Sequence, residues 1–197
     1  MSQAHAQPSA PDQDERLVEA IRAGDPRGFS EIYRRHLAWA YARLTRLVGP
    51  VAERDDLLQE IFLDLYRALP RFRGEARLST FLHRIVVNVG YEYLARARRR
   101  PPGRFSPAQL DELIEPCASP ETMAVERQSV ARALALLATL HPKKRVAFTL
   151  VVLEGMSLAE AAEVAGVSTD TMKQRVLHAR AELKDKMDRQ MRKGVAP

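Results

Sequence analysis

The chain has 197 residues, of which 46% are hydrophobic and 28% are charged, and this composition excludes an intrinsically disordered protein. Its formal net charge of +6 favours a polyanionic partner, although a basic balance does not by itself require one. A single cysteine, Cys117, excludes an internal disulfide framework, and no stretch is apolar enough to span a bilayer. We therefore expect a cytoplasmic protein without stable membrane insertion.

The first part of the chain, residues 14–100, predicts a helical bundle that follows a polar tail at residues 1–13. The tail has no basic start followed by an apolar run, so it is not a secretory signal. In the bundle, apolar residues recur at helical intervals, and Gly is sparse in the chain as a whole. Breaks rich in Gly or Pro at 24–26, 48–50 and 69–74 divide it into about four helices.

A linker rich in Pro and acidic residues follows at 101–126, with one short helix expected around 110–114. A second helical domain is expected at 127–190, followed by a short tail at 191–197. Its helices are predicted at 127–140, 142–154, 157–165 and 168–190. The expected fold class is all-α: an N-terminal helical bundle and a C-terminal helix-turn-helix domain, joined by a flexible linker.

Charge is distributed unevenly along the chain. The run "ARARRR" closes the first domain, and Lys and Arg populate the last helix. One helix in the first domain is acidic, and so is the linker, through Asp111, Glu112, Glu115 and Glu121. A basic end in each domain suggests two contacts with one long anion, whereas a solvated helix face is the alternative for each run taken alone.

Two closely spaced helices near the C-terminus have the helix-turn-helix pattern. Ser157 and Glu160 form a capping box that begins the first helix, and Gly166 ends it by adopting the left-handed conformation. Ser168 then caps the next helix, and Val167 can fill the corner between them. This pattern is typical of duplex DNA binding, and a purely structural corner is the alternative.

The second helix of this pair has two distinct faces. At 100° per residue, one stripe must face the core: Met172, Val176, Ala179 and Leu183. The opposite, N-terminal face and its flanks carry groups that can contact base edges and phosphates: Asp170, Lys173, Gln174, Arg175, Leu177, His178 and Arg180. Because base-reading helices present their first turns to the major groove, the sequence predicts DNA binding here.

Three stretches together resemble bacterial RNA polymerase sigma factors of the extracytoplasmic-function (ECF) branch. They are "DDLLQEIFLDLY", "FRGEARLSTFLHRIVVN" and "LHPKKRVAFTLVVLEGMSLAEAAEVAGVSTDTMKQRVLHARAEL". The resemblance covers both domains in the order and spacing of the family. It implies that residues 14–100 are sigma region 2, which binds polymerase and the −10 promoter element and melts DNA. It implies that residues 127–190 are sigma region 4, which binds the −35 element.

The resemblance also implies partners and site residues. The partners are promoter DNA, an anti-sigma factor, and core RNA polymerase through its β′ clamp helices and β flap. Polymerase contact is implied for the acidic helix at Asp56, Gln59, Glu60 and Asp64, for which a solvated face is the alternative.

A pocket for a base flipped from the −10 element is implied at Ala68, Phe72, Ile85 and Asn88, within the loop and helix that also hold Gly74. Contacts to the opened strand are implied for Arg73, Arg96, Arg98, Arg99 and Arg100. In the second domain, the −35 reading positions are implied at Lys173, Gln174 and Leu177, on the face that helical spacing had already assigned.

The sequence departs from the family at several positions. Phe81 stands where Trp is usual, Glu92 and Ala95 replace the more usual Asp and Arg, and His141 stands where Leu or Pro is common. The first three departures affect the preference for the −10 element.

Three other functions are alternatives to that of a sigma factor. A helix-turn-helix regulator that binds duplex DNA without polymerase explains 157–183 but not the acidic helix or the loop at 71–80. An enzyme is disfavoured, because the sequence has no metal-ligand spacing, phosphate loop or nucleophile elbow, so no catalytic residue, metal or cofactor is expected. A protein-interaction adaptor that does not bind DNA is the third. For the linker, we expect its acidic residues to mimic nucleic acid beside polymerase.

Overall fold

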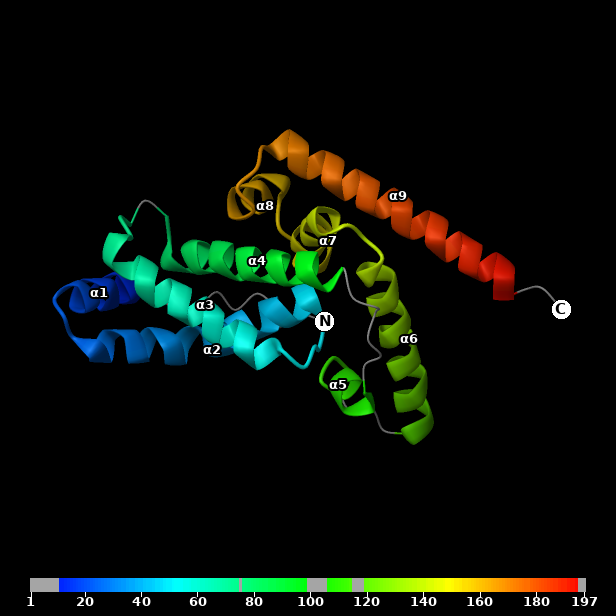
Figure 1. Ribbon diagram of the computed structural model, residues 1–197, viewed down its shortest axis with the longest axis horizontal. Helices are drawn as coiled ribbons and strands as arrows, with labels where there is room; N and C mark the ends of the chain where they lie inside the picture. The colour runs from blue at the N-terminus through cyan, green and yellow to red at the C-terminus, as the bar shows by residue number, and fades with distance from the viewer. Residues whose placement is uncertain (1–10, 75, 99–105, 115–118, 195–197) are drawn as a thin grey trace.

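The computed structural model describes residues 11–74, 76–98, 106–114 and 119–194, and all regular structure in these residues is helical (Figure 1). The predicted all-α class with two helical parts is therefore confirmed. Among the described residues, no helix has the length and apolar character needed to cross a membrane.

The N-terminal region contains four α-helices, and a 3₁₀ turn at Leu69–Arg71 extends the third. The helices are α1 (Pro11–Arg22), α2 (Pro26–Val48), α3 (Arg54–Ala68) and α4 (Leu78–Ala97). The start of α2 shows how the predicted break at 24–26 works. The Asp25 side chain accepts a hydrogen bond from the backbone N–H of Arg27, and Pro26 occupies the first helical position, where no N–H donor is needed.

The core of this region holds large aliphatic residues from α2, α3 and α4. Ile32, Leu44, Ile61, Leu65 and Leu82 are completely buried. Burial of such side chains is the main favourable contribution to folding. Their packing also fixes the angle between α3, which carries the predicted polymerase residues, and α4, which carries predicted −10 residues.

A buried contact between a histidine and a carboxylate attaches the first helix, α1, to this core. His36 of α2 is fully buried, and its Nε2 lies 3.2 Å from Oδ2 of Asp14 in α1, which is itself buried. A buried carboxylate needs such a partner to offset its desolvation, so the pair fixes where α1 lies along α2.

The rest of the described chain contains the short α5 and the C-terminal region, α6 to α9. These helices are α5 (Pro107–Asp111), α6 (Pro120–Ala138), α7 (Pro142–Phe148), α8 (Leu158–Val164) and α9 (Thr169–Gly194), with a π-helical turn at Thr149–Leu153. The helix expected to begin at residue 127 begins earlier, inside the segment predicted to be linker. Ser119 is the reason, because its Oγ accepts the Thr122 N–H at 3.2 Å and thereby caps α6.

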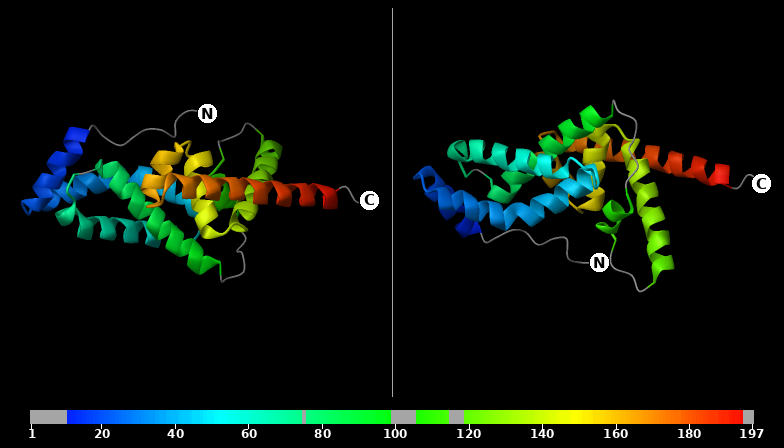
Figure 2. Two further views of the ribbon diagram at one scale, coloured as in Figure 1. Left: turned by 90° about the horizontal axis from the view of Figure 1, so that it is seen from above. Right: turned by 60° about the horizontal axis from the view of Figure 1, so that its bottom comes forward.

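The two helical regions pack against each other, with α7 and α8 lying along α4 (Figures 1 and 2). Val146, Ala147 and Leu150 of the C-terminal region belong to the same continuous core as the buried residues of α2 and α4. A smaller core joins α6 and α9 through Leu137, Leu140, Ala179 and Leu183. The sequence predicted two helical domains on a flexible linker, and it gave no sign of this packing between them.

Candidate nucleic-acid and polymerase interfaces

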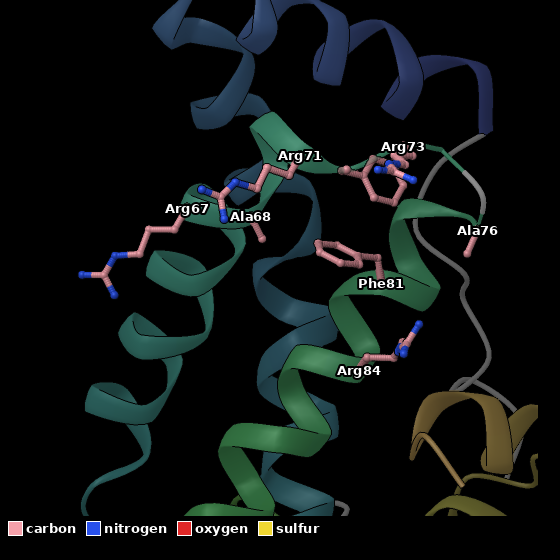
Figure 3. Close-up of a pocket in the computed structure, with 8 residues that line it drawn as sticks. Arg67, Ala68, Arg71, Arg73, Ala76, Phe81 and Arg84 are labelled. Carbon is pink, nitrogen blue, oxygen red and sulfur yellow. The ribbon is translucent and has the colours of Figure 1, made fainter. Parts of the chain in front are cut away.

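A concavity of about 570 Å³ opens between the end of α3, the following loop and the start of α4 (Figure 3). Eight described residues line it: Arg67, Ala68, Arg71, Phe72, Arg73, Ala76, Phe81 and Arg84. Four of these are arginines, and none is acidic. Three of the residues predicted for the −10 site, Ala68, Phe72 and Arg73, are therefore brought together here. The concavity therefore combines positively charged side chains with an aromatic and apolar surface. A nucleotide fits both, because its phosphate is negatively charged and its base can stack on an aromatic ring.

Two phenylalanines form the aromatic part of this concavity. The ring centroids of Phe72 and Phe81 lie 5.0 Å apart, and Phe72 is buried while Phe81 is only half-buried. Phe81 points from α4 toward the end of α3, where Ala68 lies (Figure 3). The ring that a base can stack on is therefore Phe81, and Phe72 supports it from the core side.

The loop that holds Phe72 is fixed by α1. The Arg22 guanidinium donates a hydrogen bond to the Phe72 carbonyl oxygen. Gly74, in the same loop, is exposed and has a φ of +75°, a conformation that side chains resist. The path of this loop thus depends on a hydrogen bond between two residues that are 50 positions apart in the sequence.

The remaining predicted −10 residues continue along α4 beyond the concavity. Ile85 is half-buried and Asn88 is exposed, and their spacing from Phe81 places all three on one face of the helix. Neither lines the concavity itself. Arg96 and Arg98 are exposed at the end of α4, whereas Arg99 and Arg100 lie outside the described residues.

Sequence reasoning missed four residues of the concavity, Arg67, Arg71, Ala76 and Arg84. A signal for two of them was available, because "RALPRFR" repeats arginine at 67, 71 and 73 on either side of the predicted break. Arg84 stands one helical turn after Phe81, so the face defined by Phe81 also points to it.

The predicted helix pair in the C-terminal region is present with the expected caps. Ser157 and Glu160 form a capping box at the start of α8, Gly166 has a φ of +62°, and Ser168 Oγ accepts the Thr171 N–H at 3.2 Å. Val167 is half-buried and packs against the core, as the corner position requires. The short connection is thus set by local residues.

The two faces of α9 also follow the prediction. The stripe of Met172, Val176, Ala179 and Leu183 is buried. On the other side, Leu177 is 49% exposed, so the predicted apolar member of this face does lie at the surface. The polar members of the predicted −35 face are exposed, except that Arg175 is half-buried: Asp170, Lys173, Gln174, Arg175, His178 and Arg180.

Positive charge gathers where α9, α7 and the end of α4 meet. Partial burial lowers the pKa of His141, and the cations of Arg98, Lys143, Lys144 and Arg175 lower it further. These cations come from three different helices, so the positive potential spans the boundary between the two regions.

The acidic face predicted to bind polymerase lies on α3. Asp56 and Gln59 are exposed, and Glu60 and Asp64 are half-buried. The one ion pair on this face joins Asp64 Oδ1 to Arg67 Nη1 at 3.6 Å, and such exposed pairs contribute little. The four side chains are therefore available to a partner.

Two apolar side chains accompany this acidic face. Leu63 is 53% exposed and Tyr66 is 54% exposed, and both are on α3. Leu63 follows Gln59 by four residues and Glu60 by three, so it lies among the predicted polymerase residues. Sequence reasoning did not identify it, although its position off the buried stripe of α3 was a usable signal.

The linker acids have partners within the chain. The Arg127 guanidinium donates to both carboxylate oxygens of Asp111 at 2.5 and 2.8 Å. Glu112 forms an ion pair with Arg54 at 2.7 Å and accepts a hydrogen bond from Tyr41 at 3.0 Å. In this structure these two carboxylates are thus paired within the chain, and the role expected for them beside polymerase stays a prediction. Glu115 lies outside the described residues.

Comparisons with known proteins agree with this geometry. The family model of sigma-70 region 2 matches residues 32–100, and that of sigma-70 region 4 matches residues 131–183. The ECF RNA polymerase sigma factor SigM of Mycobacterium tuberculosis is 36% identical over 171 residues, covering 86% of this chain and 82% of the relative.

Two solved structures have a similar fold. CnrH in complex with the cytosolic domain of CnrY has a TM-score of 0.62 and 27% identity, and the match covers 90% of this chain and 98% of CnrH. The sigma factor RpoE of Bartonella quintana, in complex with the anti-sigma factor NepR, has a TM-score of 0.53 and 20% identity. That match covers 81% of this chain and 96% of RpoE.

Proposed function

The chain belongs to the ECF branch of RNA polymerase sigma factors, and from this premise we propose how its surfaces divide the recognition of a promoter. Members of this family are transcription initiation factors that bind core RNA polymerase and recognise promoter DNA. In our proposal, the N-terminal region binds and opens the −10 element, and the C-terminal region binds the −35 element as duplex.

The observation that carries this proposal is the arginine-lined concavity beside Phe81. A base flipped out of the duplex loses its stacking, and an aromatic ring can replace that stacking. The surrounding guanidinium groups would bind the phosphates of the opened strand. A helix-turn-helix regulator that reads only duplex DNA has no need of such a surface, so the concavity favours a sigma factor over that alternative.

The −35 contact is proposed for the exposed face of α9. Lys173 and Gln174 are the side chains that can reach base edges in the major groove, and Leu177 can contact a thymine methyl group. Arg175 and Arg180 flank this face and would contact phosphates, which position the helix without reading sequence.

The polymerase contact is proposed for α3. Leu63 would supply the apolar centre, and Asp56, Gln59 and Glu60 would form the polar rim around it, which is the usual arrangement in stable interfaces. In this proposal the partner surface is the β′ clamp helices, and the β flap contacts the C-terminal region. An anti-sigma factor is the proposed regulator, like that bound to the RpoE of similar fold.

Run-off transcription with core polymerase on a promoter library tests the −35 assignment. We expect Lys173→Ala to lose about 1–3 kcal/mol of discrimination at one −35 position, because a side chain that reads a base edge is removed. Lys184→Ala is the matched control, since Lys184 is an exposed lysine of the same helix about three turns beyond Lys173, away from the N-terminal turns that would enter the groove. Equal base preferences for the two variants would refute the assignment.

The same library tests the −10 assignment with Asn88→Ala and Arg84→Ala. Asn88→Ala should alter the base preference at one −10 position. If this variant also opens promoters less well, a premelted template should restore opening but not the wild-type base preference. Arg84→Ala should weaken binding to single-stranded −10 DNA for every sequence, and lower the slope of log affinity against log salt by about 0.7, as the loss of one phosphate contact requires. Wild-type values for both variants would refute the −10 site.

A further inference from the structure

The backbone of the loop at residues 72–74, which we call the −10 loop, is held by a residue outside the proposed DNA contacts. Arg22 lies in the last turn of α1, and its Nη2 donates a hydrogen bond to the carbonyl oxygen of Phe72. The N–H of Phe72 donates to the carbonyl oxygen of Leu69 at 3.1 Å. The backbone of Phe72 is therefore bonded on one side to the turn that extends α3 and on the other side to α1.

The hydrogen bond from Arg22 is of the stronger kind. Its donor is a guanidinium, and a hydrogen bond with a charged donor is roughly twice as strong as one between neutral groups. The bond is partly buried, which strengthens it further because less water competes for the two atoms. Arg22 forms no ion pair with any other described residue, so the Phe72 carbonyl oxygen is the acceptor that holds its side chain.

Contacts along α1 fix where Arg22 lies. Near the start of the helix, Oδ2 of Asp14 is 3.2 Å from Nε2 of His36, and both residues are buried. Val18, one turn further on, is 3% exposed and belongs to the core. The helix also packs against the turn at Leu69–Arg71 (Figures 1 and 2). Asp14 and Arg22 are roughly 12 Å apart along this helix, so α1 acts as a rigid arm with a buried anchor at one end and the guanidinium at the other.

The place of the Phe72 carbonyl matters because its neighbours line the concavity. The Phe72 ring lies 5.0 Å from the ring of Phe81, on which we expect a base to stack, and Arg73 follows directly in the chain. Gly74 is exposed and has a φ of +75°, and glycine can adopt many other backbone conformations. A loop with such a residue has several paths open to it without an anchor, and the hydrogen bond from α1 favours one of them.

We propose that Arg22 is a positioning residue for the −10 element: it holds the Phe72 carbonyl, so that the site for the flipped base is formed before DNA binds. The proposal rests on the proposed function, because it takes the concavity as the base site. Arg22 itself contacts no DNA in this proposal. Its contribution is to lower the cost of ordering the −10 loop when the base enters, a cost that otherwise reduces affinity.

This role differs in its consequences from two simpler roles. A residue that only stabilises the fold changes the fraction of folded chain, so affinity falls equally for every DNA. A residue that binds a phosphate lowers affinity for every sequence, and its loss lowers the slope of log affinity against log salt by about 0.7 on a single strand. A positioning residue affects only those strands that place a base in the site.

Binding of single-stranded −10 DNA to holoenzyme, formed from core polymerase and the full-length chain, tests the proposal. The probes are the preferred −10 strand and the same strand with an abasic site at each position in turn. The abasic position that weakens wild-type binding most identifies the flipped base. Arg22→Met keeps an unbranched apolar stem but has no donor, and it should bind the intact strand about three- to tenfold more weakly than the wild type. On the strand that lacks the flipped base, the two chains should bind equally, with equal salt slopes.

Two further variants complete the test. Arg16→Met is the matched control, because Arg16 is an exposed arginine of the same helix and its replacement changes the net charge by the same amount. Arg22→Lys keeps a donor at the end of a long side chain, so it should recover part of the lost affinity. Partial misfolding of Arg22→Met would appear as an equal loss on the intact and abasic strands. That result, intact-strand affinity equal to that of Arg16→Met, or no recovery in Arg22→Lys would each overturn the proposal.

Failure of this proposal can be told apart from failure of the proposed function. A wild-type holoenzyme that binds the intact strand no more tightly than any abasic strand has no site for a flipped base, and the proposed −10 function is then refuted. A wild-type holoenzyme that distinguishes these strands, with Arg22→Met identical to Arg16→Met, would refute only the positioning role of Arg22.

Discussion

Gly28 shows how one residue without a side chain sets the position of α1. A Cβ atom added to Gly28 would lie 2.9 Å from the Leu17 carbonyl oxygen and 2.9 Å from Cγ1 of Ile21. The first of these is a backbone atom, so it cannot move aside without moving α1. Because α1 carries Arg22, which holds the loop at Phe72, the absence of this side chain affects the proposed −10 site.

We expect Gly28→Ala to lower the free energy of unfolding by about 1–2 kcal/mol, although alanine favours a helix more than glycine does. The clash should displace α1 and loosen the loop that it supports. Chemical denaturation measures the first effect, and hydrogen exchange of the loop amides measures the second. Ser30→Ala, at an exposed position two residues later, is the control for helix propensity alone. An unchanged or higher stability for Gly28→Ala would show that α1 does not pack this closely.

At the same scale, the arginines around the concavity differ from those of an ordinary charged surface. Arg34 and Arg35 both pair with Glu31, and this lowers the pKa of Glu31 to about 2. Among the described residues that line the concavity, Arg71 and Arg84 form no ion pair, and Arg67 pairs with Asp64 only at 3.6 Å. Side chains that pair with each other need no ligand, whereas several arginines that converge on one concavity favour a bound anion.

At the scale of elements, α5 is a five-residue helix held in place by its neighbours. A helix of this length is not stable alone in water. Leu110 is buried, Gln109 Nε2 donates a 2.6 Å hydrogen bond to the Pro50 carbonyl oxygen, and Glu112 pairs with Arg54 at the start of α3. These contacts anchor α5 beside α3, the helix that carries the proposed polymerase surface.

The attachment of α5 should depend on pH. The Arg54 guanidinium holds the pKa of Glu112 below its usual value of 4.5, and a hydrogen bond from Tyr41 also lowers it. A carboxyl group whose pKa is lowered by folding stabilises the folded form above its unfolded pKa, and this stabilisation is lost as pH falls through the folded pKa. We therefore expect the attachment of α5 to weaken progressively as pH falls below about 4.5, as measured by NMR of its amides.

Glu112→Gln is the control for this titration, because it cannot change charge. In that variant α5 should be weakly attached at neutral pH, and its remaining pH dependence should come from Asp111, whose pKa Arg127 lowers. A full acid transition in Glu112→Gln would show that another group holds α5 in place.

At the scale of the whole molecule, one core runs through both regions. Leu150 is 1% exposed and belongs to the core shared by α2, α4 and the C-terminal helices, whereas Leu183 belongs to the small core between α6 and α9. Their replacement by alanine removes the same atoms from two different cores. The two variants can therefore show whether the regions unfold together.

We expect each Leu→Ala variant to lose about 2–5 kcal/mol of unfolding free energy, because a cavity is left in a packed core. Leu150→Ala should also speed hydrogen exchange in α2 and α4, since the shared core couples them to α7. Leu183→Ala should change exchange only in α6, α7 and α9. Unchanged exchange in α2 and α4 of Leu150→Ala would mean that the two regions are stable independently.

Predictions from the sequence succeeded where the cause is local. The caps at Ser157 and Ser168, the turn at Gly166 and the stripe from Met172 to Leu183 each depend on residues within one or two helical turns. The exposed face of α9 followed from the same spacing. The start of α6 was misplaced, although Ser119 and Pro120 were a readable signal, because the composition around them resembles a linker.

The site at the −10 loop was predicted only in part. Ala68, Phe72 and Arg73 were named from family resemblance, and they do line the concavity. The walls that complete it come from separate helices, so which arginines converge depends on the angle between α3 and α4. No pattern along the chain encodes that angle.

The sequence by itself determined that the chain is helical, where most helices begin and end, and which side chains of α9 face outward, because each of these follows from hydrogen bonds and burial within a few residues. Only the tertiary structure decided that Glu154 meets Arg43 and His83, and that Arg145 meets Leu47. These partners are between about 70 and 110 positions apart, and their pairing depends on how whole helices pack. No repeating spacing of residues along the sequence indicates such long-range contacts, so only the three-dimensional structure identifies them.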